Sequence, residues 1–236
     1  QPHIREGKQS KGRETGTVEF RDVTFRYPNA AGNELEHISF RVGRGQTLAV
    51  IGATGSGKST LVSLIPRFYD ATEGSVLVDG VDVKEYTFDT LYNKLGYVTQ
   101  KAVLFSGTVR ENVFFGESAA QDTDASLSAA LQLSQADEFV SRYPEGAAHP
   151  IAQLGRNVSG GQKQRLSIAR ALARNPEILV FDDSFSALDY RTDAALREGL
   201  ARELPDTTKI IVAQRISTIR HADQILVLDR GELVGH

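Results

Sequence analysis

The sequence of 236 residues contains no cysteine, no methionine and no tryptophan. Without cysteine, disulfides and thiolate metal sites are excluded, and a reducing compartment fits this composition without being proven by it. No apolar run approaches the roughly 20 residues that a membrane-spanning helix needs. No signal peptide is visible either.

Strong charge of one sign is also lacking. The formal net charge is −3 and the isoelectric point is about 6.0, so nothing favours nucleic acid or an anionic membrane as a partner. Hydrophobic residues make up 40% of the chain, which suffices for one large domain or for a core with a subdomain.

The absence of methionine extends to the first position, so we expect the chain to be a piece of a longer protein. Residues 1–16 are polar and contain glycine, and this composition indicates a linker.

Strand patterns occur in the first part of the chain and return near its end. β-branched and aromatic residues mixed with charges run from Thr17 to Tyr27, which favours a strand. Alternating or continuous apolar runs predict the other strands, of which GQTLAVIG is expected to be deeply buried. The predicted strands are HISFRV, GQTLAVIG, SVLVDG, LGYVTQ, EILVFD, TKIIVA and QILVLD.

Helical patterns alternate with the later strands. Helices are expected from Lys58 to about Phe68, over GGQKQRLSIARALARNP, and from about Tyr190 to Glu203. Residues 100–165 include DASLSAALQLSQADEFVSRY, whose spacing and alanine and leucine content predict a helical subdomain. Strands alternating with helices after an initial β-rich portion predict an α/β core.

The segment GATGSGKST satisfies the pattern G-x-x-x-x-G-K-[ST]. Its glycines let backbone N–H groups curl around phosphate oxygens, and the following helix presents its positive end. We expect Lys58 to reach the β- and γ-phosphates and Ser59 to bind Mg²⁺. The residues expected to contact the nucleotide here are Gly52, Ala53, Thr54, Gly55, Ser56, Gly57, Lys58, Ser59 and Thr60.

The strand ILVF leads to two adjacent carboxylates, Asp182 and Asp183. Ligands of α/β sheets bind at the carboxyl ends of strands, so Asp182 is expected to hold Mg²⁺, usually through water. The next residue normally polarises the attacking water, and here that residue is Asp183. The alternative is that both aspartates cap the following turn.

A second glycine motif precedes a long basic helix. Ser159, Gly160, Gly161 and Gln162 open it in NVSGGQKQRLSIARAL, so its N-terminus suits an anion. A monomer with one phosphate loop has no evident need for a second anion site. The pair makes sense if the second motif contacts a nucleotide held by another subunit.

Taken in order, these motifs resemble the nucleotide-binding domain of exporter-type ATP-binding cassette (ABC) transporters. GATGSGKST resembles the Walker A loop, ILVFD the Walker B strand, VSGGQ the signature and SALD the D-loop. The resemblance implies that Tyr27 stacks on adenine. It implies that Gln100 contacts Mg²⁺ and the attacking water, and that Asp189 of the D-loop belongs to the nucleotide site.

The resemblance covers roughly residues 17–235 and carries further expectations. The fold would be a P-loop ABC ATPase core, with a mixed or parallel sheet, flanking helices and an N-terminal antiparallel β portion, over residues 17–99 and 166–236. The helical subdomain would be residues 100–165, and residues 1–16 would link to a transmembrane domain of the same polypeptide. ATP and Mg²⁺ would be the cofactors, and a second nucleotide-binding domain the partner. The domain would lie at the cytoplasmic face of the cell membrane, touching the membrane only through its transmembrane domain.

The chain departs from the family at two positions that matter for hydrolysis. Asp183 stands where glutamate is usual, and its shorter side chain withdraws the carboxylate by one methylene. Gln214 stands where histidine usually contacts the γ-phosphate, and glutamine cannot become a cation. A softer departure is Gln153, where many exporters carry glutamate, while His221 is interpreted as a surface residue.

These departures favour one half of a heterodimeric exporter with unequal ATP sites. Its own site would bind Mg-ATP and hydrolyse it slowly, and its intact signature would complete the competent site of a non-identical partner. A homodimeric exporter that uses Asp183 as a serviceable base is the alternative. A soluble, non-transport ABC-type ATPase is a third hypothesis, disfavoured because no heptads are sustained and the charge is mildly negative.

Overall fold

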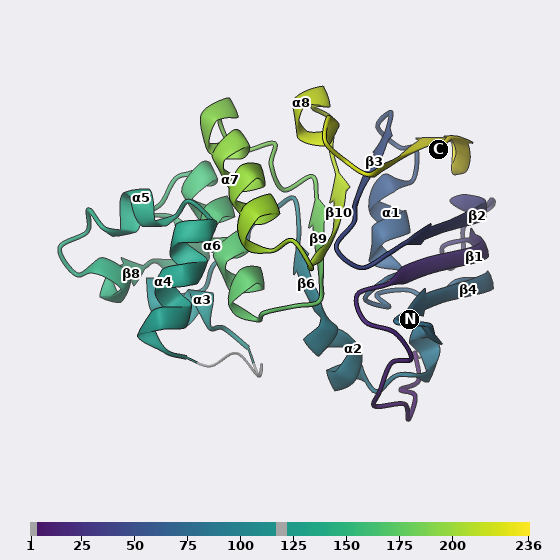
Figure 1. Ribbon diagram of the computed structural model, residues 1–236, viewed down its shortest axis with the longest axis horizontal. Coiled ribbons are helices and arrows are strands. Elements are labelled where there is room, and N and C mark those ends of the chain that lie inside the picture. Colours follow the sequence, from purple (N-terminus) through teal and green to yellow (C-terminus); the bar gives the residue numbers. More distant parts are fainter. Residues whose placement is uncertain (1–3, 117–121) are drawn as a thin grey trace.

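The computed structural model describes residues 4–116 and 122–236. Within these residues a six-stranded sheet has the order β12-β11-β3-β10-β9-β6, and a four-stranded antiparallel sheet has the order β2-β1-β4-β5. Figure 1 shows the four-stranded sheet at one end of the molecule and helices α3 to α6 at the other, with the six-stranded sheet between them. The predicted mixed α/β fold is confirmed.

The strands are β1 (Val18–Phe25), β2 (Leu35–Val42), β3 (Thr47–Gly52), β4 (Glu73–Val78), β5 (Val81–Asp82), β6 (Leu95–Val98), β7 (Gly107–Thr108), β8 (Pro150–Ile151), β9 (Ile178–Asp182), β10 (Thr208–Val212), β11 (Gln224–Asp229) and β12 (Glu232–Gly235). The α-helices are α1 (Lys58–Ser63), α2 (Phe88–Lys94), α3 (Val109–Val113), α4 (Asp124–Leu133), α5 (Asp137–Val140), α6 (Gly160–Ala173), α7 (Tyr190–Glu203) and α8 (Ile216–Ile219). Short 3₁₀ turns occupy Val83–Glu85, Gly146–Ala148 and Gln153–Gly155.

The central strands are mostly apolar because both faces of the sheet are covered. β3, β6, β9, β10 and β11 run parallel, and all five residues of β10 are buried. Side chains alternate between the two faces: Val180 packs in the cluster that contains α1, whereas Phe181 packs in the cluster that contains α6 and α7. Helices α1 and α6 therefore cover opposite faces of the same sheet.

A separate apolar cluster lies within the helical part of the chain. It joins residues of α3, α4, α5 and α6, among them Val109, Leu131, Phe139 and Leu166. The helical pattern expected from residue 124 onward is interrupted between α4 and α5, where Gln135 has a positive φ of 63°. This left-handed conformation ends a helix, so two short helices replace one.

Further elements differ from the sequence expectation, and they include the helices α2 and α8, which were not predicted. α1 ends at Ser63 rather than near Phe68, because Pro66 lacks an N–H donor and disfavours helical backbone in the residue before it. β12 was not predicted, and it pairs with β11 across a tight turn. Arg230 and Gly231 both have positive φ in that turn, which is typical of a two-residue hairpin.

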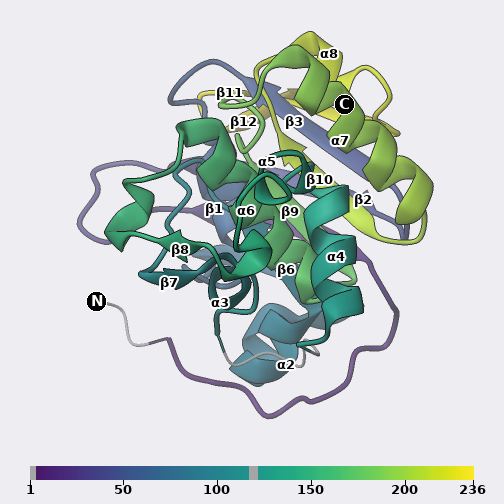
Figure 2. The ribbon, with the colours of Figure 1, turned by 90° about the vertical axis from the view of Figure 1, so that its left-hand side faces the viewer.

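The N-terminal segment 4–16 lies along the domain rather than apart from it, as the purple trace in Figure 2 shows. The backbone N–H of Arg13 donates to the carbonyl of Asp79 at 2.7 Å, and that of Thr17 donates to the Asp79 carboxylate at 3.0 Å. Lys94 bridges Asp79 at 2.8 Å and Glu177 at 3.3 Å. This ionic cluster joins the segment to the residue before strand β9.

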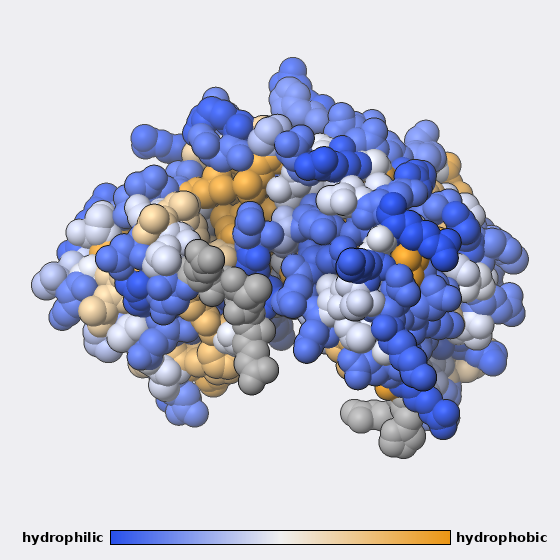
Figure 3. All heavy atoms as spheres, turned by 60° about the horizontal axis from the view of Figure 1, so that its bottom comes forward, coloured by the Kyte–Doolittle hydropathy of each residue, from blue (hydrophilic) through white to orange (hydrophobic). Residues whose placement is uncertain are grey.

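Most of the surface drawn in Figure 3 is hydrophilic, and apolar side chains gather near its middle. Phe105 and Phe115 are exposed large hydrophobic residues whose rings stack at 4.0 Å between centroids.

Within the ranges that the structure describes, no helix combines the length and hydropathy that crossing a bilayer requires.

Candidate active site

The carboxyl ends of the parallel strands surround a cavity of about 410 Å³. β3 leads into the glycine loop and α1 leaves it, while β6, β9 and β10 bring in side chains from residues far along the chain. This is the edge of an α/β sheet at which ligands bind. The cavity is lined by Glu34, Thr54, Gly55, Ser56, Gly57, Lys58, Ser59, Thr60, Gln100, Asp183, Val212 and Gln214.

Gly57 shows why the loop needs glycine. It precedes α1 with a φ of 102°, which side chains rarely tolerate. A Cβ atom there would meet Cδ2 of Leu35 at 2.9 Å. The close packing keeps the loop backbone against the four-stranded sheet. The first residues of α1 line the cavity, and their backbone N–H groups have no partner within the helix.

Lys58 and Ser56 supply donors to this cavity. The Lys58 ammonium donates to the carbonyl of Gly52 and, at 3.0 Å, to that of Ala53. The Ser56 hydroxyl is buried and has no hydrogen-bond partner among the described residues. A buried polar atom without a partner is costly, so a phosphate oxygen fits the donors of this loop.

Asp182 and Ser59 form the candidate metal site. The Ser59 hydroxyl donates to Oδ1 of Asp182 at 2.9 Å. Burial raises the pKa of Asp182, and the hydrogen bond from Ser59 opposes that rise. A hydroxyl and a carboxylate beside a phosphate cavity are the hard oxygen ligands that Mg²⁺ takes, so the residues present fit this ion.

Asp183 lies directly opposite Gln100. The Gln100 side-chain amide donates to Oδ2 of Asp183 at 3.0 Å, and the Asp183 N–H donates to the carbonyl of Val212 at 3.0 Å. Burial raises the pKa of Asp183, while the positive charges of Lys58 and Arg215 act in the opposite direction. The carboxylate is thus oriented in the cavity instead of capping the turn that follows it.

Tyr27 adjoins the cavity through Thr60. The two hydroxyl groups are 2.6 Å apart, and the Tyr27 ring packs edge-on against Phe25 and Tyr69. These aromatic contacts fix the ring beside a second hollow of about 440 Å³, lined in part by Ile4, Tyr27 and Tyr69. Tyr27 lines this hollow, and its hydroxyl contacts Thr60, which lines the phosphate cavity.

The signature residues lie apart from this cavity. Ser159 caps α6: its hydroxyl accepts from the N–H of Gln162 at 3.2 Å, and the Gln162 side chain accepts from the N–H of Ser159 at 3.0 Å. Gly160 is exposed, and Gly161 is half-buried. None of these residues lines the phosphate cavity, so this chain does not bring its two glycine motifs onto one ligand.

The cavity lining also leaves out Asp189, Gln153 and His221. Of the predicted nucleotide and metal contacts, it leaves out Tyr27, Gly52, Ala53 and Asp182. The Asp189 carboxylate caps α7 by accepting from the N–H of Thr192 at 2.8 Å. Gln153 is exposed in a 3₁₀ turn, and His221 is exposed on a different cavity. The structure therefore gathers Lys58, Ser59, Gln100, Asp182, Asp183 and Gln214, and leaves the signature and D-loop elsewhere.

Glu34, Val212 and Arg215 lie at or near the cavity and were not predicted as site residues. Glu34 lines it from the segment before β2, and no sequence signal marks it. Arg215 follows Gln214 and donates to the carbonyls of Leu188 at 2.8 Å and Ser186 at 3.1 Å. A cation beside a candidate phosphate-contacting residue was a signal that could have drawn attention to it.

The family described as ABC transporter matches residues 35–186. The chain belongs to this family. An uncharacterized ABC transporter ATP-binding protein of Mycobacterium tuberculosis is 49% identical over 222 residues, which are 94% of this chain and 38% of that protein. A putative multidrug export ATP-binding/permease protein of Bacillus subtilis is 43% identical, with 93% of this chain and 37% of that protein covered.

An ATP-dependent lipid A-core flippase of Aromatoleum aromaticum is 42% identical over 99% of this chain and 39% of its own length. The structure of a bacterial Atm1-family ABC exporter with ATP bound superposes with a TM-score of 0.91 at 37% identity, covering 98% of this chain and 41% of that one. The chain thus spans about two fifths of the length of these relatives. It is an ABC-type ATP-binding domain similar to those of exporters.

Proposed function

We propose that this chain is the ATP-binding part of a heterodimeric ABC exporter, and that its own site binds Mg-ATP but hydrolyses it slowly. The observation that supports this most is the composition of the phosphate cavity, where Asp183 and Gln214 face the loop that contains Lys58. The groups that bind phosphate and Mg²⁺ are present. The group expected to polarise the attacking water and the group expected to contact the γ-phosphate are both altered, at Asp183 and Gln214.

Each side chain has a defined task in this proposal. Lys58 and the N–H groups of the loop bind the β- and γ-phosphates, and Ser59 and Asp182 hold Mg²⁺, which neutralises phosphate charge when bound. Asp183, oriented by Gln100, accepts the proton of the attacking water. Its carboxylate is one methylene shorter than glutamate, and a misplacement on the order of 1 Å costs about 10²-fold in rate. Gln214 can donate a hydrogen bond to the γ-phosphate but brings no positive charge to it.

The partner is proposed to be a second, non-identical ABC domain. The signature at the start of α6 is capped and accessible, yet it does not reach the phosphate cavity of its own chain. It is therefore available to close the nucleotide site of a partner. Asp189 lies in the D-loop that follows Asp183, and it would contribute at the same interface.

The remaining parts of the longer protein are proposed from the relatives. Residues 1–16 would lead from a transmembrane domain, residues 17–236 would form the ABC domain, and residues 100–165 would be its helical subdomain; residues 1–3 and 117–121 lie outside the described residues. The groove that includes Phe68, Tyr97 and Phe115 offers an apolar surface for that transmembrane domain. Such a protein would export its substrate from the cytoplasmic face of a cell membrane.

A complementation experiment tests the unequal-site proposal. Asp183→Glu with Gln214→His should raise ATP turnover of the chain by about 10²-fold. Adding Ser159→Arg to this double variant should abolish its activity, because no intact signature then completes the repaired site. Mixing that inactive triple variant with wild type should restore turnover, since the wild-type signature closes the repaired site.

The control mixture contains the triple variant and wild type carrying Ser159→Arg, and it should remain inactive. Wild-type turnover equal to that of the double variant would contradict the slow-site proposal and favour a homodimer with a serviceable Asp183. Salt-sensitive binding of DNA by the chain would favour a soluble, non-transport ATPase instead.

A further inference from the structure

Arg215 connects two loops that lie at different places around the phosphate cavity. It follows Gln214, which lines the cavity, and its guanidinium reaches the turn of residues 184–189 between β9 and α7. Nη1 donates to the carbonyl of Leu188 at 2.8 Å and Nη2 to that of Ser186 at 3.1 Å. A planar guanidinium with two donors fixes two carbonyls in one orientation, which a single ammonium cannot do.

The turn that Arg215 holds is itself attached to Asp183. The hydroxyl of Ser186 donates to the backbone carbonyl of Asp183 at 3.0 Å. The buried hydroxyl of Ser184 donates to the carbonyl of Val98 at 2.7 Å. The turn therefore lies between the candidate base and Arg215, and it contains the D-loop, which is the part proposed to face a partner subunit.

The buried carboxylate of Asp193 lies beside the guanidinium of Arg215. Asp193 of α7 is fully buried and accepts from Arg197 at 2.7 Å and from Thr218 at 3.2 Å. Nη1 of Arg215 lies 3.6 Å from the same carboxylate, and its guanidinium carbon lies 4.8 Å from the centre of the exposed ring of Tyr190. The charge of Asp193 and the contact with the Tyr190 ring together hold Arg215 across the start of α7.

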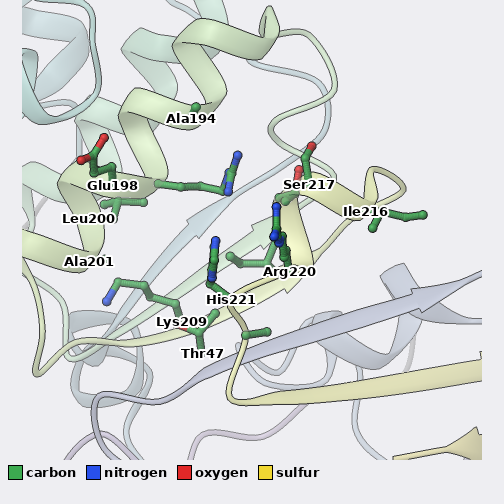
Figure 4. Close-up of a pocket in the computed structure, with 14 residues that line it drawn as sticks. Thr47, Ala194, Glu198, Leu200, Ala201, Lys209, Ile216, Ser217, Arg220 and His221 are labelled. Atoms are coloured by element: carbon green, nitrogen blue, oxygen red, sulfur yellow. The ribbon is translucent and has the colours of Figure 1, made fainter.

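The segment that follows Gln214 does not pack continuously on the domain. A cavity of about 690 Å³ separates part of α7 from β10 and the α8 segment, and its walls include Leu200, Ile211 and Arg220. Figure 4 shows this hollow and Ile216 pointing away from α7. Arg215 adds polar contacts between this segment and the turn, beside the apolar contact that buried Ile219 makes with the core.

We propose that Arg215 is a positioning residue that couples contact with the γ-phosphate to the D-loop. When Gln214 moves toward a γ-phosphate, the adjacent guanidinium carries the carbonyls of Ser186 and Leu188 with it. The turn then sets both the orientation of Asp183 and the surface offered to the partner. This inference rests on the proposed function, since it needs a nucleoside triphosphate in the phosphate cavity.

Hydrogen exchange measured by mass spectrometry tests this coupling in the 236-residue chain, at a concentration where it is monomeric. A non-hydrolysable ATP analogue with Mg²⁺ should slow exchange in residues 184–189 more than ADP does. Arg215→Met should lose this difference between triphosphate and diphosphate while protection of residues 52–60 by both nucleotides remains. Arg215→Lys keeps the charge and should lose most of the difference, because it cannot hold both carbonyls.

Arg220→Met is the matched control, because Arg220 is exposed five residues further on and should leave the difference unchanged. A triphosphate-specific difference that persists in Arg215→Met would overturn the inference, as would loss of protection at residues 52–60 in that variant. Absence of protection at residues 52–60 in the wild type would overturn the proposed function, and with it the inference. In steady-state hydrolysis, Arg215→Met should lower kcat by roughly tenfold and change KM by less than about twofold.

Discussion

The side-chain amide of Gln100 donates a 3.0 Å hydrogen bond to the carboxylate of Asp183, although the two residues are 83 positions apart. They meet because β6 and β9 are parallel neighbours, with Val98 opposite Phe181. Each polar residue comes two positions after the end of that paired register. The orientation of Asp183 is therefore set by Gln100, which follows the neighbouring strand β6. Gln100 can be substituted without changing Asp183 itself.

Replacing Gln100 with alanine tests that orientation. Gln100→Ala removes the hydrogen bond to Asp183 but no group from the phosphate loop. ATP hydrolysis should fall by about tenfold while the affinity for ATP stays within about twofold of wild type, since misorientation of a base affects the chemical step. Turnover and calorimetric binding measure the two quantities.

Gln153→Ala is the control for Gln100→Ala, because Gln153 is an exposed glutamine outside the phosphate cavity. It should change neither quantity. A loss of ATP affinity in Gln100→Ala, without a loss of turnover, would contradict the orienting role of Gln100.

Two substitutions of Tyr27 separate its ring from its hydroxyl. Tyr27→Phe removes the 2.6 Å contact with Thr60 but keeps a ring. ATP affinity should change by less than about threefold, because the lost hydrogen bond joins two protein groups and none to ATP. Tyr27→Ala removes the stacking surface and should weaken ATP binding by roughly 5- to 150-fold, which corresponds to ~1–3 kcal/mol per stacked base.

Inorganic triphosphate provides the control for Tyr27, because it has no base. Its affinity should be the same for wild type and Tyr27→Ala. A parallel loss for triphosphate and ATP would show that Tyr27 acts on the phosphate loop through Thr60 and does not contact the base.

The Asp182 carboxylate should lower stability at neutral pH. Its pKa in the folded protein is raised above the usual value of 3.8, chiefly by burial, so folding favours the protonated form. The stability contributed by that form is complete below pH 3.8 and is lost as the pH rises through the folded-state pKa. Asp182→Asn should therefore be more stable than wild type at neutral pH, with a difference that shrinks as the pH falls.

Thermal unfolding at several pH values measures this effect, and exposed Asp206→Asn serves as the control. The same Asp182→Asn variant should bind ATP with little dependence on Mg²⁺, because an amide is a poorer ligand than a carboxylate for this ion. Lower stability of Asp182→Asn at neutral pH would contradict the assigned cost of burying this charge.

Lys94 should be important for stability rather than for hydrolysis. Asp79 is fully buried and pairs with Lys94 at 2.8 Å. Burial alone would lower the pKa of Lys94, but the hydrogen bond and charge of Asp79 and the charge of Glu177 raise it overall. Lys94→Met leaves Asp79 without its cation, which should reduce the free energy of unfolding by about 3–5 kcal/mol.

Chemical denaturation measures the change for Lys94→Met, with exposed Lys101→Met as the control. The N-terminal segment should also lose protection from hydrogen exchange, since Arg13 and Thr17 are bound to Asp79. An unfolding free energy within about 1 kcal/mol of wild type would show that this pair contributes no more than a surface pair.

Much of the architecture could be predicted from local patterns. The apolar runs that became β9 and β10 and the helix over Tyr190–Glu203 were predicted with nearly correct bounds, because burial on both faces or on one helix face leaves a clear periodicity. The breaks were not predicted: α4 and α5 separate at Gln135, and α1 ends early. Such ends depend on single backbone conformations, which periodicity does not record.

The candidate site likewise contains features that the sequence predicted and features that it did not. The glycine loop with Lys58, the carboxylates at the end of β9 and the signature were visible as contiguous motifs, because phosphate binding by backbone N–H groups demands a fixed local spacing. Contacts between distant segments were not visible. The Gln100–Asp183 and Ser59–Asp182 pairs depend on which strands are neighbours in the sheet, and strand order is not a property of any one segment.

By itself, the sequence determined the family to which the chain belongs and the chemistry of each motif, since these depend on residue types at short spacings. Tertiary structure decided which motifs share a cavity. It placed Asp183 and Gln214 beside the phosphate loop, left the signature elsewhere, and laid Arg215 across the turn before α7. The reason is physical: the parallel order of the strands brings their carboxyl ends to one edge, whereas α6 covers the opposite face of the sheet from α1.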